Sequence, residues 1–173
     1  NVLRQTTARL PWLLIGMLGG IGNSMILGNF DTTFAAHPEM ALYIPLIGGT
    51  GGNVGTQSSA LVVQGLANSS LDANNTWKQI LKESIVALIN ATIISMLVYV
   101  YNFIRFGATA TVSYSVSLSL FAVVMFASIF GTLVPMTLEK LKIDPAIATG
   151  PFISITNDII GMMLYMGITV LLS

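Results

Sequence analysis

Five apolar runs, each of roughly 20 residues or more, constrain the fold of this chain more than any other feature. A helix needs about 20 mostly apolar residues to cross the hydrocarbon core of a bilayer. Only 8% of the residues are charged and 54% are hydrophobic, whereas a soluble domain carries roughly 25% charged residues. The sequence therefore predicts an all-α integral membrane protein, with five spans expected at residues 10–30, 41–67, 84–104, 113–136 and 147–172.

The same composition excludes several classes of function. The formal net charge is zero, so nothing in it favours nucleic-acid binding. The chain has no cysteine and a single histidine, so it offers neither a disulfide framework nor a zinc cluster of thiolates and imidazoles. His37 stands beside Pro38 and is interpreted as a loop residue, which leaves no Ser-His-Asp arrangement. We expect the protein not to be an enzyme.

The fourth run opens with serines at every second position, from Ser113 to Ser119. Such alternation is typical of a strand, but the length of the run and the apolar residues that follow it favour a helix. In a helix, a serine hydroxyl group can donate a hydrogen bond to the backbone of the preceding turn. We therefore predict a helix for this run.

The cationic residues indicate how the five spans are oriented. If the N-terminus is cytoplasmic and the C-terminus lies outside, only Arg105 of the seven cationic residues lies on the outer side. This orientation obeys the rule that lysine and arginine gather on the cytoplasmic side. The polar segment 68–83 is then an inner loop that leads into a short interfacial helical turn. The six residues predicted on the inner side are Arg4, Arg9, Lys78, Lys82, Lys140 and Lys142.

Asp158 is the one acidic residue predicted within a span rather than in a loop or at a span end. At ~1.5 Å per residue, it lies about 17 Å from the expected start of its helix, close to the middle of the membrane. A charge at that depth costs roughly 2.5–3.5 kcal/mol, and no lysine or arginine lies within a predicted span to neutralise it. Asp158 must therefore face water, bind a cation or be protonated.

The predicted helical face around Asp158 offers further oxygen atoms. Pro151 lacks an N–H and clashes with the carbonyl group four residues earlier, so the carbonyl groups of residues 147–150 are expected to be free. Ser154, Gly161 and Tyr165 lie on the same face by helical spacing. Carboxylate, hydroxyl and carbonyl oxygens are hard ligands, which suit Mg²⁺ or Ca²⁺ better than soft metals.

The second run, with the sequence GGTGGNVGTQ at residues 48–57, combines many glycines with a polar stripe. Gly49, Asn53, Gln57 and Gln64 lie along one face of the expected helix. Glycines four residues apart allow helices to approach closely, so the pattern alone indicates tight packing. Beside an unpaired aspartate in another span, the polar stripe favours a pore wall.

Three interpretations of these features remain open at the level of the residues. The first is a divalent-cation channel or carrier. The second is a proton-coupled membrane transporter with Asp158 as the proton relay. The third is an assembly subunit that carries no ion, in which the polar stripe only holds helices together.

Two segments together resemble a known family. The core sequence GNVGTQS at residues 52–58 resembles the signature of the second transmembrane helix of the MgtE family of magnesium transporters. The fifth run begins with DPA at residues 144–146 and continues to Asp158, Gly161 and Tyr165, as in the fifth helix of that family. The resemblance extends over essentially all 173 residues.

The resemblance implies a homodimer with five transmembrane helices per subunit and a pore at the subunit interface, lined by the second and fifth helices. Asp158 is expected to bind the hydrated cation, and the resemblance implies that this cation is Mg²⁺. The ions Mn²⁺, Co²⁺ and Ca²⁺ accept the same oxygen ligands. The backbone carbonyl groups of Ser154 and, more weakly, Gly150 are expected to assist. The expected pore-lining residues are Gly49, Asn53, Gln57, Pro151, Gly161 and Tyr165.

The resemblance also implies a location and partners. It indicates a multi-pass protein of the bacterial inner membrane, surrounded by lipid. Full-length family members carry regulatory domains on the cytoplasmic side, an N-terminal helical domain and a pair of CBS modules. We interpret residues 1–173 as the transmembrane ion-conducting domain without them, and expect those domains as partners in the full-length protein.

Overall fold

The computed structural model describes the backbone of residues 1–173 and the side chains of residues 1–147 and 150–173. Across that backbone the fold is helical and contains no strand. Four short helices connect the long ones: α2 (Asp31–Ala36) and the 3₁₀ helices η1 (Pro38–Tyr43), η2 (Ala73–Asn75) and η3 (Pro145–Thr149). The long helices are α1 (Val2–Gly28), α3 (Ile44–Ala67), α4 (Thr76–Phe106), α5 (Thr111–Lys140) and α6 (Pro151–Leu172).

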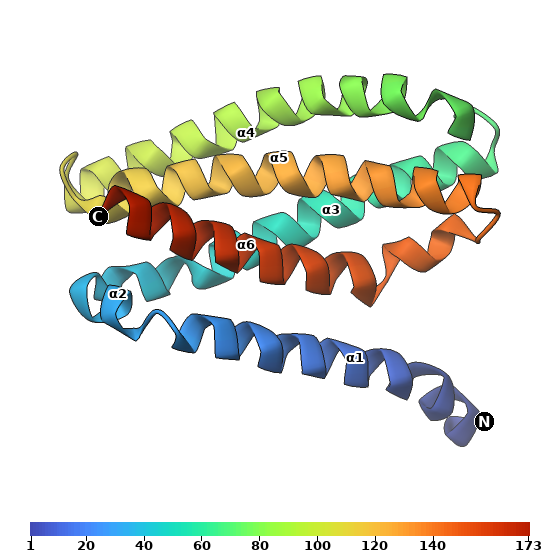
Figure 1. Cartoon of the computed structure of the whole chain (residues 1–173), viewed down its shortest axis with the longest axis horizontal. Helices are drawn as coiled ribbons and strands as arrows, with labels where there is room; N and C mark the ends of the chain where they lie inside the picture. Colours follow the sequence, from blue (N-terminus) through green and yellow to red (C-terminus); the bar gives the residue numbers. More distant parts are fainter.

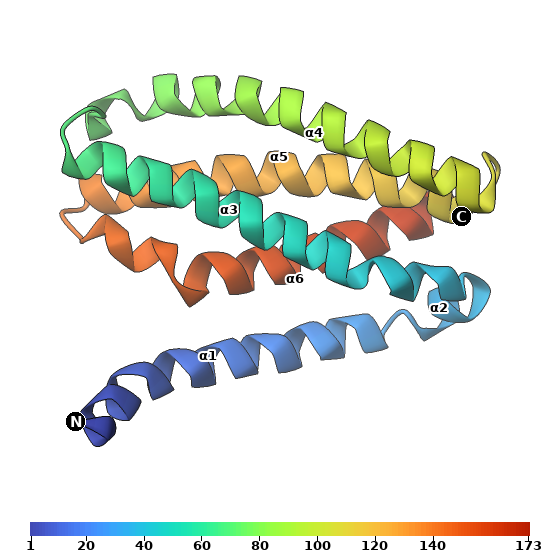
Figure 2. The ribbon, with the colours of Figure 1, turned by 180° about the vertical axis from the view of Figure 1, so that it is seen from behind.

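The long helices run back and forth along one direction, and α5 is the central one (Figure 1). Helices α3, α4 and α6 all pack against α5. Helix α1 lies along one side of the bundle, where its main contact is with α6 (Figure 2). The chain therefore forms a packed group of four long helices with a fifth helix at its edge.

The serine-rich start of α5 is helical, as predicted, and it is buried. The hydroxyl group of Ser117 donates to the carbonyl oxygen of Ser113 at 3.1 Å, and the hydroxyl group of Ser113 donates to the carbonyl oxygen of Gly107 at 2.6 Å. Alternating positions on a helix point in several directions, so all four serines are buried only because neighbours surround α5.

Helix bounds differ from the sequence prediction mainly at the starts of α1, α4 and α6, and α1 begins at Val2, eight residues before the expected span. Helix α4 begins at Thr76, so the expected interfacial turn is the first part of one continuous helix. Helix α6 begins at Pro151, and proline at the first position does not interrupt a helix because that N–H has no helical partner. The proline therefore starts α6 instead of breaking a longer helix.

Four segments are long and apolar enough to cross a membrane: α1, Ala73–Phe106, α5 and α6. Helix α3 is not among the candidates found in the described part of the chain, because its glycines and polar residues lower its hydropathy. Large apolar side chains are exposed along α1 and α4, including Leu18 at 62% and Leu97 at 66%. Extended apolar surface of this kind is typical of helices that face lipid.

Candidate functional site

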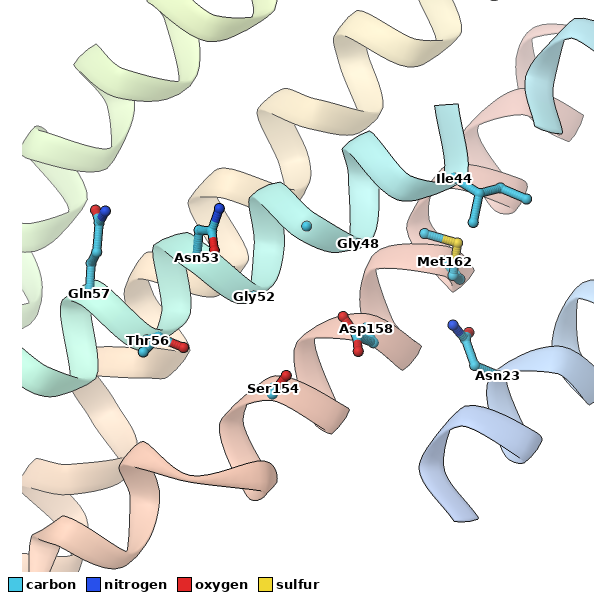
Figure 3. Close-up of a pocket in the computed structure, with 11 residues that line it drawn as sticks. Asn23, Ile44, Gly48, Gly52, Asn53, Thr56, Gln57, Ser154, Asp158 and Met162 are labelled. Carbon is cyan, nitrogen blue, oxygen red and sulfur yellow. The ribbon is translucent and has the colours of Figure 1, made fainter. Parts of the chain in front are cut away.

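A polar cleft lies between α1, α3 and α6. It has a volume of about 600 Å³, and its wall contains one ionisable side chain, that of Asp158 (Figure 3). Polar groups reach it from all three helices. Its lining residues are Asn23, Ile44, Gly48, Gly49, Gly52, Asn53, Thr56, Gln57, Ser154, Asp158 and Met162.

Helix α3 supplies seven of these residues: Ile44, and six that form pairs recurring every four positions from Gly48–Gly49 to Thr56–Gln57. This spacing places them on one side of a helix. Three of the six are glycines, and the opposite face carries the buried residues Gly51 and Gly55. The glycine-rich segment is thus a single helix with a cleft face and a packed face.

The glycines on the cleft face leave the carboxylate of Asp158 accessible. A Cβ atom at Gly48 would lie 3.7 Å from Oδ1 of Asp158, in van der Waals contact, so a longer side chain there would cover it. A Cβ atom at Gly49 or Gly52 would meet no other atom within 4 Å, because both positions face open space. The side chains of Asp158 and Ser154 point from α6 toward α3 (Figure 3).

Asp158 has no cationic partner among the described residues, whose one close acid–base pair joins His37 and Glu39 at 3.9 Å. The described residues also contain no group of three or more histidine, cysteine, aspartate or glutamate side chains able to hold a metal ion. The cleft offers one carboxylate together with amide and hydroxyl groups. That set suits an ion which keeps its water shell, since each water molecule donates hydrogen bonds to such oxygens.

Five of the residues expected at the site lie together in this cleft: Gly49, Asn53, Gln57, Ser154 and Asp158. Ser154 lines it with its side chain, whereas the prediction assigned a role to its backbone carbonyl group. Within an α-helix that carbonyl accepts the N–H of the residue four positions on, so the hydroxyl group is the freer donor and acceptor.

Two expected pore-lining residues are instead packed inside the subunit. Tyr165 is fully buried, and its hydroxyl group donates to the carbonyl oxygen of Met40 at 2.8 Å. Gly161 is buried as well, and a Cβ atom there would lie 3.7 Å from Val123 and 3.8 Å from Ile47. Helix η1 covers α6 at the level of Tyr165.

Pro151 and Gly150 are also expected at the site. Neither residue lines the cleft, because α6 begins at Pro151 and Asp158 lies two turns further along. At ~1.5 Å per residue, Asp158 is about 10 Å from the start of the helix, not about 17 Å. The carboxylate is therefore closer to the start of α6 than to its end.

Sequence reasoning missed Asn23, Thr56 and Met162 as lining residues. Thr56 adjoins Gln57 on the stripe that was identified, so the width of the helix face was underestimated. A sequence signal for Asn23 does exist, because it is a polar residue within an apolar run. Asp158 shows the same signal with a charged side chain. Met162 follows Asp158 by one turn and has no distinctive signal.

Apolar helices around a polar cleft with a single carboxylate are typical of an integral membrane protein. The family described as "Divalent cation transporter", MgtE, matches residues 44–168, which is well over half of the chain. The chain belongs to the MgtE family. The resemblance noted from the two motifs is thereby confirmed, as is the expectation that the protein is not an enzyme.

Three curated relatives are similar to nearly the whole chain, and each is named magnesium transporter MgtE. The protein from Bacillus subtilis is 33% identical over 92% of this chain and 35% of its own length. That from Thermus thermophilus is 33% identical over 95% of this chain and 36% of its own length. The protein from Enterococcus faecalis is 29% identical over 97% of this chain and 37% of its own length. The chain thus spans about a third of the length of these relatives.

Proposed function

We propose that this chain forms the ion-conducting membrane part of a magnesium transporter, and that hydrated Mg²⁺ moves along the cleft between α3 and α6. The observation that carries the proposal is the unpaired carboxylate of Asp158 in a polar cleft between apolar helices. A charge in that setting is costly unless water or a cation accompanies it. Asp158 is the central cation-binding group.

The size of the cleft fits a hydrated ion. Mg²⁺ is octahedral and gives up its water slowly, and six waters at ~30 Å³ each occupy about 180 Å³. The cleft volume of about 600 Å³ exceeds this several times. Asp158, Ser154, Asn53 and Gln57 then contact the water shell. Mn²⁺, Co²⁺ and Ca²⁺ accept the same oxygen ligands and are candidate competitors.

The proposed assembly is a homodimer with five spans per subunit, in which the cleft lies at the subunit interface. Two Asp158 carboxylates near a two-fold axis neutralise one divalent ion, and a two-fold axis is the commonest symmetry of homo-oligomers. The interface also shelters the cleft side of α3, which explains how this less apolar helix crosses the membrane. Lipid surrounds the exposed faces of α1 and α4.

The proposed orientation places the end that carries six of the seven cationic residues in the cytoplasm. The N-terminus, the α3–α4 turn and the α5–α6 turn gather at this end, whereas the C-terminus and the end of α4 lie at the other (Figure 1). Arg105 belongs to the last turn of α4. The positive-inside rule assigns the first end to the cytoplasm. The membrane is the bacterial inner membrane, and further cytoplasmic domains of a longer protein are proposed partners.

Uptake of Mg²⁺ into liposomes by the wild-type chain and by Asp158→Asn tests the proposal. The asparagine has nearly the same shape but no charge, so we expect uptake to fall at least tenfold, which corresponds to about 1.4 kcal/mol. Asp31→Asn makes the same change at an exposed carboxylate outside the cleft lining, so it is the matched control and should leave uptake unchanged. Equal uptake by Asp158→Asn and wild type would refute the proposal, and flux that follows pH without divalent ions would support the proton relay instead.

A further inference from the structure

Asn23 is a polar residue on a helix that is otherwise apolar and exposed. Helix α1 has no buried residue, yet the Oδ1 atom of Asn23 is shielded from solvent and has no hydrogen-bond partner. A shielded carbonyl oxygen without a donor costs free energy. The side chain of Asn23 lines the same cleft as Asp158 and points toward α6 (Figure 3).

The register between α1 and α6 explains why Asn23 reaches this level. A Cβ atom at Gly19 would lie 2.6 Å from Cγ2 of Ile155, so these two residues fix the closest approach of the helices. Both helices run in the same direction (Figure 1). One turn beyond that contact, about 6 Å along α1 and about 4.5 Å along α6, stand Asn23 and Asp158. They therefore face the cleft at the same depth.

We infer that Asn23 contacts the hydrated cation from a third helix, and that its amide group turns the Oδ1 atom into the cleft, where it accepts a hydrogen bond from the cation's water shell. This inference rests on the proposed function of the cleft. The carboxylate of Asp158 and the hydroxyl group of Ser154 approach the ion from α6, the stripe of α3 lies opposite them, and Asn23 approaches it from α1. A donated water hydrogen satisfies the oxygen that has no partner within the chain.

The test compares Mg²⁺ uptake by the whole chain in liposomes for wild type, Asn23→Ala, Asn23→Asp and Ser24→Ala. Asn23→Ala should raise the KM for Mg²⁺ about fivefold, equivalent to about 1 kcal/mol, with little change in maximal rate. Asn23→Asp keeps an acceptor oxygen and should keep KM at or below the wild-type value. Ser24 is exposed on the same helix, and Ser24→Ala should behave as wild type.

A second probe separates contact with the water shell from contact with the metal. Hexaamminecobalt(III) does not exchange its ligands, so it mimics only the outer surface of a hydrated cation. Its inhibition constant should rise by the same factor as KM in Asn23→Ala. An unchanged KM in Asn23→Ala, or an equal rise in KM in Ser24→Ala, overturns the inference. The proposed function still stands in that case if Asp158→Asn abolishes Mg²⁺ uptake. Normal uptake by Asp158→Asn refutes the proposed function itself.

Discussion

At the scale of single residues, Gly131 of α5 and Gly55 of α3 show how closely the helices pack. A Cβ atom at Gly131 would lie 2.6 Å from the carbonyl oxygen of Gly55 and 3.2 Å from Cβ of Ser58. A Cβ atom at Gly55 would in turn collide with the side chain of Asn157, which is 1% exposed. Three helices therefore meet at positions where a methyl group has no room.

The substitution Gly131→Ala should destabilise the fold. The clash at Gly131 involves the backbone of α3, which cannot turn aside as a flexible side chain would, so the two helices must separate. Overpacking of this kind costs about 1–3 kcal/mol. Thermal unfolding of the detergent-solubilised chain, followed by circular dichroism, should show a lower Tm.

Gly20→Ala is the matched control for this prediction. A Cβ atom at Gly20 would meet no other atom within 4 Å, and alanine favours a helix over glycine by about 1 kcal/mol. The Tm of this variant should stay the same or rise. A Gly131→Ala variant as stable as Gly20→Ala would contradict the close contact between α3 and α5.

The sequence indicated that glycines of the second run allow close approach, but not which of them do so. Gly51 and Gly55 are buried, whereas Gly52 faces the open cleft, although all three belong to the same small-residue pattern. Spacing along a helix identifies residues that share a face. It does not identify what lies opposite, because the neighbour belongs to a distant part of the chain.

At the scale of elements, the hydrogen bond from Tyr165 to Met40 joins α6 to η1. The donor, the acceptor residue and their surroundings are buried in the apolar cluster that also contains Ile47 and Leu120. The link covers α6 just beyond Met162, which is the last α6 residue that lines the cleft. Tyr165 thus has a structural role in place of the pore-lining one expected from the sequence.

The variant Tyr165→Phe should lower stability and leave the affinity for Mg²⁺ unchanged. It removes the donor and leaves the carbonyl oxygen of Met40 buried and unpaired, which costs about 1–3 kcal/mol. Chemical unfolding in detergent should detect the loss, and liposome uptake should give a wild-type KM.

Tyr114→Phe provides the comparison for Tyr165→Phe. The hydroxyl group of Tyr114 also donates to a backbone oxygen, that of Leu172, but at 3.4 Å and in an exposed setting. Its removal should change stability little. Equal losses in the two tyrosine variants would argue against the buried link as the cause.

The helical character of the chain and the location of its long helices could be predicted because apolar runs of this length have few alternatives. The short helices α2 and η1 could not, since six residues carry too little periodicity to be distinguished from a loop. The start of α6 was placed too early because Pro151 was treated as a break within a helix. A proline signals a boundary equally well when the helix begins there.

At the scale of the whole molecule, the chain has no cysteine, which makes its orientation directly measurable. The exposed residues Asn74 and Thr109 lie just beyond opposite ends of α4 and suit single cysteine substitutions. In right-side-out cells, a membrane-impermeant maleimide should label Thr109→Cys and not Asn74→Cys. The reverse labelling pattern would contradict the proposed topology.

Light scattering of the purified protein should give the mass of two chains, and a single-chain mass would contradict the dimer.

The family and the carboxylate could be predicted from sequence because both are local: two motifs and one charge in an apolar run. The third wall of the cleft, formed by α1, could not be predicted in this way. It depends on where α1 packs, and its contact with α6 joins residues that are more than 130 positions apart, Gly19 and Ile155. Such a pairing leaves no trace in the spacing of either segment.

The lone carboxylate has an electrical consequence. Asp158 is fixed in the wall, and α6 contains no lysine or arginine whose movement could offset the charge of a passing ion. In the proposed function, each Mg²⁺ that crosses therefore carries both of its charges through the membrane voltage. At ~2.3 kcal/mol per charge per 100 mV, a potential of that size contributes about 4.6 kcal/mol per ion. A contribution of this size sustains roughly a thousandfold concentration ratio, so the proposed path needs no coupled ion to accumulate Mg²⁺.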